Sequence, residues 1–250
     1  MQLAAKVAIV TGGGSGIGQA ACLAFAREDA QVVVANRTLN KAQAVTAQIE
    51  AAGGQALAVQ ADVSRSADIK ALIAATVARF GGLDILFNNA GISPVGTVTE
   101  ISEEDWDECL NIDLKSIFLG AKYAIPELIK RGGGVILNSV GTFGIRPVRG
   151  KAAYAAAKGG AVNLTRAIAL DYARDGIRCN AICPGYIDTP LNDSFPVAER
   201  DQFLEHYQPL RGLIQAEEVA QMAVYLASDA ARMLTGQLFV IDGGQQAGIF

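Results

Sequence analysis

A tyrosine and a lysine stand four residues apart in the stretch YAAAKGG, which begins at Tyr154. In a helix, positions i and i+4 lie on one face, so the phenol of Tyr154 and the ammonium of Lys158 are expected one turn apart. A cation at that distance favours the phenolate, and such a tyrosine can exchange a proton with a hydroxyl group. The same pattern is also typical of a small-residue helix face packed against a neighbour. The rest of the chain must distinguish these interpretations.

The composition limits the class of protein. Of 250 residues, 51% are hydrophobic but only 6% are aromatic, and 27 are glycine. Small aliphatic residues in this proportion are typical of parallel strands that helices bury on both faces. The net charge of -4 argues against a nucleic-acid or anionic membrane partner, and the four-residue apolar run before Thr11 is too short for a signal peptide or membrane span. We therefore expect a soluble cytoplasmic protein.

The sulfur and imidazole groups indicate no metal site. The cysteines are scattered without a CxxC pair, and His206 is the only histidine. This excludes a histidine-rich metal site and disfavours a cysteine-rich one. We interpret the thiols as small buried hydrophobic groups in a reducing compartment. They are Cys22, Cys109, Cys179 and Cys183.

The elements that must position Tyr154 and Lys158 follow from an alternation along the whole chain. Short β-branched runs alternate with longer alanine-rich stretches, and glycines stand where a helix should end and a strand begin. Repeated βα units predict a single Rossmann-like domain over residues 1–250, with a doubly wound parallel sheet of about seven strands and helices on both faces. The expected strands are residues 6–11, 31–36, 55–60, 83–88, 134–139, 177–183 and 237–242.

A glycine-rich loop, TGGGSGIG, runs from Thr11 to Gly18 between the first expected strand and a helix. Glycines let the backbone turn tightly and approach a pyrophosphate, whose charge then lies against the N–H groups of the helix N-terminus. A plain turn or a generic phosphate site is the alternative. The lysine of a P-loop is missing, however, and the strand-turn-helix context favours a dinucleotide.

The loop and six later matches resemble the short-chain dehydrogenase/reductase family. NNAG at 88–91 follows the fourth expected strand, and PGYIDT at 184–189 follows the sixth. Between them come Asn111, Ser139 and the YxxxK pair, while the ending at 234–244 resembles the family's last strand. The resemblance covers essentially the whole chain. It implies an NAD(P)(H)-dependent oxidoreductase that interconverts a secondary alcohol and a ketone by hydride transfer.

The resemblance also implies a catalytic set of Asn111, Ser139, Tyr154 and Lys158. Tyr154 would be the general acid/base, and Lys158 would favour its phenolate and hold the nicotinamide ribose. Ser139 would bind the substrate oxygen, and Asn111 would organise a water relay to Lys158. Asn111 alone could instead be a polar residue satisfied inside a helix. Ser139 and Tyr154 are fifteen positions apart, which indicates a short insertion at residues 146–150.

The expected cofactor contacts come from the resemblance, residue by residue. Asp62 would contact the adenine, although an isolated aspartate after a strand often caps a helix. The expected cofactor-binding residues are Gly12, Ser15, Gly16, Ile17, Gly18, Asn36, Arg37, Asp62, Val63, Asn89, Ala90, Gly91, Tyr154, Lys158, Pro184, Gly185, Ile187 and Thr189.

The residues that end the second expected strand bear on the choice of cofactor. An acidic residue at Asn36 would bind the ribose diol and repel a 2′-phosphate, but asparagine carries no charge. Arg37 can place its guanidinium against that phosphate. Ser15 stands where many NADP-dependent relatives have a second basic residue, which weakens this interpretation. The pattern favours NADP(H), with NAD(H) as the alternative.

The less regular segment at about 190–211 is expected to be a substrate lid, with His206 as a surface residue. The substrate is expected to be a small-molecule alcohol or ketone, and the family implies a homotetramer. A β-ketoacyl reductase of fatty-acid type and a catalytically silent cofactor-binding regulator stay as alternatives. A serine hydrolase is disfavoured because LNSVG lacks the first glycine of the nucleophile elbow.

Overall fold

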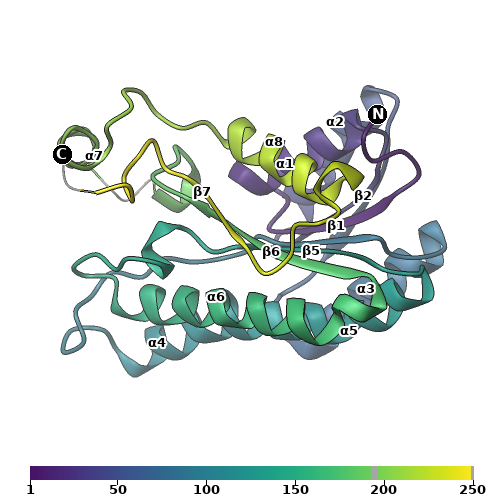
Figure 1. Cartoon of the computed structure of the whole chain (residues 1–250), viewed down its shortest axis with the longest axis horizontal. Coiled ribbons are helices and arrows are strands. Elements are labelled where there is room, and N and C mark those ends of the chain that lie inside the picture. Colours follow the sequence, from purple (N-terminus) through teal and green to yellow (C-terminus); the bar gives the residue numbers. More distant parts are fainter. Residues whose placement is uncertain (193–195, 249–250) are drawn as a thin grey trace.

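One parallel sheet of seven strands forms the centre of the molecule, whose computed structural model describes residues 1–192 and 196–248 (Figure 1). The strand order is β3-β2-β1-β4-β5-β6-β7, so the chain reverses its direction of winding between β1 and β4. In such sheets the crevice at the carboxyl ends of the strands, at this switch point, is the usual ligand site. The strands are β1 (Val7–Thr11), β2 (Gln31–Asn36), β3 (Gln55–Gln60), β4 (Ile85–Asn88), β5 (Gly134–Ser139), β6 (Ile177–Pro184) and β7 (Leu238–Ile241).

Helices cover both faces of the sheet, as the composition predicted (Figure 1). Successive strand residues point to opposite faces, so Val10 of β1 joins the core beneath one helix layer and Ile9 the core beneath the other. The first layer holds α1 (Gly16–Arg27), α2 (Leu39–Ala51) and α8 (Ala216–Ala227). The second holds α3 (Ser66–Phe80), α5 (Ser116–Lys130) and α6 (Ala152–Tyr172). The predicted doubly wound fold is confirmed, with strand ends shifted by one or two residues.

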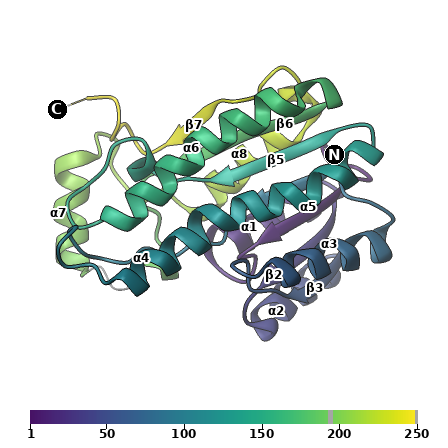
Figure 2. The same cartoon turned by 90° about the horizontal axis from the view of Figure 1, so that it is seen from below.

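A long helical rod runs into the second layer from α4 (Glu103–Leu110). Ser102 caps it by accepting a hydrogen bond from the Asp105 amide, and acidic residues fill its first turn. Before α5 begins, the rod widens into a π-helical turn, η1 (Asn111–Lys115). Figure 2 shows α4, together with α7 (Val197–Tyr207), at the end of the molecule toward which β5 points. Turns of this kind occur mostly at functional sites.

The bare stretch of α6 has a packing reason. A Cβ on Gly160 would lie 2.8 Å from the side chain of Leu114 in η1. Ala157 and Ala161 are fully buried. Only small side chains let the two helices come this close, so the packing interpretation of this stretch holds alongside the chemical one.

A chain of buried hydrogen bonds ties the sheet to α6. The amide of Asn88 in β4 donates to Asn138 Oδ1 in β5 (2.9 Å), and Asn138 donates in turn to Thr165 Oγ1 in α6 (2.9 Å). The Thr165 hydroxyl donates to the Ala161 carbonyl. Buried amides must be satisfied in this way, so the chain holds α6 at one place on the sheet.

The four cysteines are buried and free. Burial raises the pKa of Cys109, Cys179 and Cys183 to about 12, which keeps these thiols protonated near neutral pH.

Within residues 1–192 and 196–248, no helix combines the length and the apolar character needed to cross a membrane.

Candidate active site

Tyr154 and Lys158 lie one turn apart on the face of α6 that meets the sheet. The Lys158 Nζ is 5.6 Å from the centre of the Tyr154 ring, and both side chains are buried. The lysine donates a hydrogen bond of 2.9 Å to the backbone carbonyl of Ser139, the last residue of β5. All three residues line one cleft. The structure thus brings together three of the four predicted catalytic residues.

The backbone at Gly141 passes directly beside the Tyr154 hydroxyl. A Cβ on this residue would lie 2.9 Å from Tyr154 Oη, and the φ angle of +77° is one that side chains rarely adopt. Glycine therefore keeps the space around the phenolic oxygen open. A substrate oxygen could approach Tyr154 through that space.

Asp113 is a site residue that the sequence analysis missed. Its carboxylate belongs to η1, is 0% exposed, and lines the same cleft. Its Oδ2 lies 3.0 Å from Lys158 Nζ in an ion pair, and its Oδ1 accepts a hydrogen bond of 2.8 Å from the Ile92 amide. A charge that is buried away from water needs an opposite charge and hydrogen-bond donors nearby, and Asp113 has both.

Asn111 does not line the cleft with the other three, and its catalytic role stays a prediction. The Asn111 side chain lines an adjoining surface hollow and accepts a hydrogen bond of 3.2 Å from Lys115. Two positions later on the helix, Asp113 points inward to Lys158. Residues two apart on a helix lie on different faces, so the two side chains cannot share one role. The alternative interpretation of Asn111, a polar residue satisfied within its helix, fits the structure.

The cleft continues to the glycine-rich loop and fits a dinucleotide pyrophosphate. The Ser15 side chain accepts no hydrogen bond from the first turn of α1, a turn that the structure describes in full and that contains no acidic residue. Its N–H groups remain available to an anion. Gly18 packs so tightly beneath this turn that a Cβ would lie 2.6 Å from Asn89 Nδ2. The backbone N–H of Asn89 donates to Thr11 Oγ1, which fixes the wall of the cleft opposite this turn.

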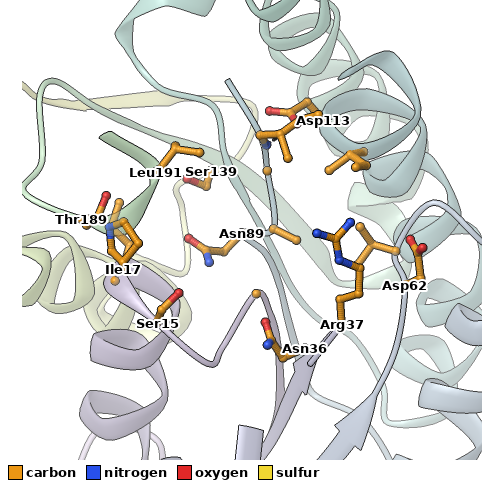
Figure 3. A pocket seen from close by; sticks show the side chains of 18 of the residues that line it. Ser15, Ile17, Asn36, Arg37, Asp62, Asn89, Asp113, Ser139, Thr189 and Leu191 are labelled. Atoms are coloured by element: carbon orange, nitrogen blue, oxygen red, sulfur yellow. Dashed lines mark hydrogen bonds between the residues drawn. The ribbon is translucent and has the colours of Figure 1, made fainter. Parts of the chain in front are cut away.

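The adenosine end of the cleft carries a basic and an acidic side chain. Figure 3 shows Arg37 and Asp62 next to each other, with Asn36 below them in the view. Burial works to raise the pKa of Asp62, but hydrogen bonds from Ser64 and the charges of Arg37 and Arg65 outweigh it and lower the pKa. The Asn36 amide donates to the Thr38 carbonyl.

Most predicted cofactor residues line the cleft, but four lie outside its described lining. Ile187 is buried in the core beside α8, and Gly185 packs against Asp242, where a Cβ would meet the backbone at 2.9 Å. Gly18 and Pro184 lie behind the surface of the cleft. Contacts of these four with a cofactor stay predictions. Besides Asp113, the lining residues that the prediction missed are Ala61, Ile92, Ile112, Pro190 and Leu191.

A row of aromatic side chains lies beside the Tyr154 end of the cleft, outside the residues that line it. Phe143, in a short helix after Ser139, packs with Ile92 against the cluster that contains Tyr154. The edge of the Phe143 ring meets Phe203 of α7 at 6.4 Å between centroids, and Phe203 contacts Tyr207 at 5.0 Å. An aromatic row therefore joins the loop after Ser139 to α7.

Comparison with known proteins identifies the family. A family model described as enoyl-(acyl carrier protein) reductase matches residues 12–246. A cyclohexanol dehydrogenase of Acinetobacter sp. (strain SE19) is 41% identical over 95% of this chain and 94% of its own length. The chain belongs to the short-chain dehydrogenase/reductase family.

Two further members extend the comparison. A 2,5-dichloro-2,5-cyclohexadiene-1,4-diol dehydrogenase of Sphingobium indicum is 40% identical over 99% of both chains. The crystal structure of a short-chain type dehydrogenase/reductase from Mycobacterium marinum has a TM-score of 0.94 at 32% identity, over 99% of this chain and 98% of that one. As a short-chain dehydrogenase/reductase, the protein is a nicotinamide-dependent oxidoreductase that interconverts alcohols and ketones.

The electrostatics of this short-chain dehydrogenase/reductase set the resting protonation of Tyr154. Burial raises the pKa of Tyr154, the Lys158 ammonium opposes this, and the Asp113 carboxylate adds to it, so the net pKa is raised. Burial would lower the pKa of Lys158, but the charge of Asp113 outweighs burial and raises it. Without a cofactor, the site therefore holds a neutral phenol beside an ammonium ion.

Proposed function

We propose that the protein interconverts apolar cyclic secondary alcohols and their ketones, with Tyr154 as the general acid/base and NADP(H) as the preferred cofactor. The observation that carries this proposal is the aromatic row that begins beside Ser139 and Tyr154. A polyol or sugar would need several hydrogen-bonding groups where this row presents ring carbon atoms.

In alcohol oxidation, the Tyr154 phenolate removes the proton of the substrate hydroxyl while the hydride leaves the carbon that bears it. Ser139 would hydrogen-bond the substrate oxygen and hold it beside Tyr154. Lys158 stabilises the phenolate through its charge and faces the ribose region of the cleft. The bound nicotinamide supplies the hydride acceptor. In ketone reduction, Tyr154 returns the proton to the oxygen.

The substrate class is tested with a panel of cyclic alcohols, polyols, hydroxy acids and β-ketoacyl thioesters, followed by nicotinamide absorbance. A cyclohexanol-type alcohol is expected to have a kcat/KM at least about tenfold above any polyol, because the aromatic row binds ring carbons and leaves extra hydroxyl groups unpaired. Faster turnover of a β-ketoacyl thioester would support the β-ketoacyl reductase instead. No absorbance change with any compound would support the silent regulator.

The preference for NADP(H) rests on Arg37 and Asn36. Both line the adenosine end of the cleft, and neither brings a negative charge to the place of the ribose 2′ oxygen. Arg37 is exposed at the edge of the cleft, where its charge acts on the neighbouring Asp62 (Figure 3). A 2′-phosphate would form a charge-assisted hydrogen bond with it.

Arg37→Ala is expected to weaken NADP binding by roughly 10- to 100-fold while barely changing NAD binding, since one charge-assisted hydrogen bond contributes about 1.5 to 3 kcal/mol. Fluorescence titration of both cofactors measures this. Arg65→Ala is the matched control, because Arg65 also acts on Asp62 but lies outside the lining of the cleft. Wild-type protein that binds NAD more tightly than NADP would contradict the proposal.

Three further parts of the proposal concern the molecule as a whole. Residues 190–211 form the substrate lid, of which 193–195 lie outside the described residues.

A homotetramer is supported by Phe118 and Leu170, which expose 46% and 82% of their surface on α5 and α6. We also expect the last strand and the chain end, GIF at 248–250, to meet another subunit of that tetramer, although 249–250 lie outside the described residues. A cytoplasmic location stays a prediction.

A further inference from the structure

The carboxylate of Asp113 has no part in the proton transfer described above, yet it lies inside the active site. It is fully buried on the π-helical turn η1, at a depth where an unpaired charge would be very unfavourable. Gly91 leaves it just enough room, since a Cβ there would lie 3.0 Å from Asp113 Oδ2. The site is therefore shaped around an acid at this position.

Asp113 and the end of β5 hold Lys158 from two directions. Lysine has a flexible four-carbon stem, so its ammonium needs partners to stay in one place. Here Asp113 Oδ2 lies 3.0 Å from Nζ, and the Ser139 carbonyl accepts a hydrogen bond of 2.9 Å. Asp113 is held in turn by the Ile92 amide at 2.8 Å. The ammonium is thus fixed near the Tyr154 ring by η1 and β5 together.

We propose that Asp113 is a positioning residue that holds the Lys158 ammonium and limits how much of its positive charge acts on Tyr154. The inference rests on the proposed role of Tyr154 as the acid/base. It gives the direct contact with Lys158 to Asp113, whereas the family resemblance implied a water relay through Asn111.

The charges around Tyr154 make this role specific to Asp113. The groups that act on the phenol are Lys158 on its own helix, Asp113 on η1, Cys109 on α4 and Cys183 on β6. Both thiols have a pKa of about 12 and are uncharged near neutral pH. Asp113 and Lys158 are therefore the two charged groups of this set. Removing the negative one takes away a charge that disfavours the phenolate.

The direct test is a spectroscopic titration of tyrosinate absorbance in the cofactor-free protein. The difference between a protein and its Tyr154→Phe counterpart isolates the titration of Tyr154. In Asp113→Asn, the midpoint for Tyr154 is expected at least about one pH unit below that of wild type. Asn111→Ala is the matched control and is expected to leave the midpoint unchanged, since Asn111 lies on the outer face of the helix. An unshifted midpoint in Asp113→Asn overturns the proposal.

A second readout is the pH profile of kcat/KM for alcohol oxidation. In Asp113→Asn the midpoint of its acid limb is expected to move to lower pH by a similar amount, because the base forms more readily. A reduced rate with an unchanged midpoint would indicate a structural role alone and contradict the inference.

Wild type provides a test if Asp113→Asn does not fold, a result that thermal unfolding would reveal. Its Tyr154 is expected to titrate at or above the ordinary tyrosine value of about 10. A midpoint below about pH 9 in the cofactor-free wild type would overturn the inference. These titrations need no turnover, so they are distinct from failure of the proposed function, which would appear as unchanged activity in Tyr154→Phe.

Discussion

Tyr154→Phe is expected to lower kcat by at least ~10²-fold while leaving the cofactor dissociation constant close to its wild-type value. The substitution removes one oxygen atom and keeps the ring that packs with Ala153, Ala157 and Phe143. The fold and the cofactor cleft should therefore be preserved, whereas the group that exchanges a proton with the substrate is lost. Steady-state kinetics and cofactor titration measure the two effects separately.

Tyr172→Phe is the matched control for this prediction. Tyr172 ends the same helix and packs at the edge of a hydrophobic core, with no place in the cleft described by the structure. It is expected to turn over substrate at the wild-type rate. Near-wild-type turnover in Tyr154→Phe would refute the proposed acid/base role.

Lys158→Met is expected to impair both chemistry and stability. Without the ammonium, the phenolate loses its favourable charge and the ribose region of the cleft loses a donor, so kcat should fall and cofactor binding should weaken. The buried Asp113 carboxylate is also left without its cation, and breaking a buried ion pair costs about 3 to 5 kcal/mol. Kinetics, cofactor titration and urea unfolding measure these three losses.

The stability loss in Lys158→Met should depend on pH in a defined direction. Burial raises the pKa of Asp113 in the folded protein, and loss of the nearby cation removes an opposing effect. A raised pKa means that the folded state binds the proton more tightly than the unfolded state, so stability is recovered as the pH falls toward the ordinary carboxyl value near 4. The deficit relative to wild type should therefore shrink in acid.

Lys115→Met is the control for the lysine prediction, because Lys115 is exposed on the neighbouring π-helical turn and bonds to Asn111. It is expected to unfold at nearly the wild-type urea concentration. A stability deficit in Lys158→Met that is equal at neutral and acid pH would contradict the proposal that Asp113 is an ionised carboxylate at neutral pH.

The sequence predicted the fold well because its signals are local. Each strand is a short apolar run, and the YxxxK pair depends only on the geometry of a single helix. β4 begins at Ile85 rather than at residue 83, and the preceding Asp84 binds the Val7 amide and Arg131 through its carboxylate. Such contacts between distant segments leave no local pattern.

The helix itself explains why Asp113, and not Asn111, faces Lys158. Cys109, Asp113 and Ile117 follow at intervals of four and are buried, whereas Asn111 and Lys115 lie on the other side. That periodicity was a usable signal for Asp113. It was outweighed by the match to a motif residue.

The hydrogen-bonded chain from Asn88 through Asn138 to Thr165 explains why the spacing between Ser139 and Tyr154 can vary. Asn138 immediately precedes Ser139, and Thr165 stands three turns along α6 from Tyr154. The distance between Ser139 and Tyr154 is therefore set by hydrogen bonds in the buried interior, and not by the length of the connecting loop. Residues 146–150 can therefore lengthen that loop without altering the distance between Ser139 and Tyr154. The loop is consequently free to diversify around different substrates while the chemistry beside it stays constant.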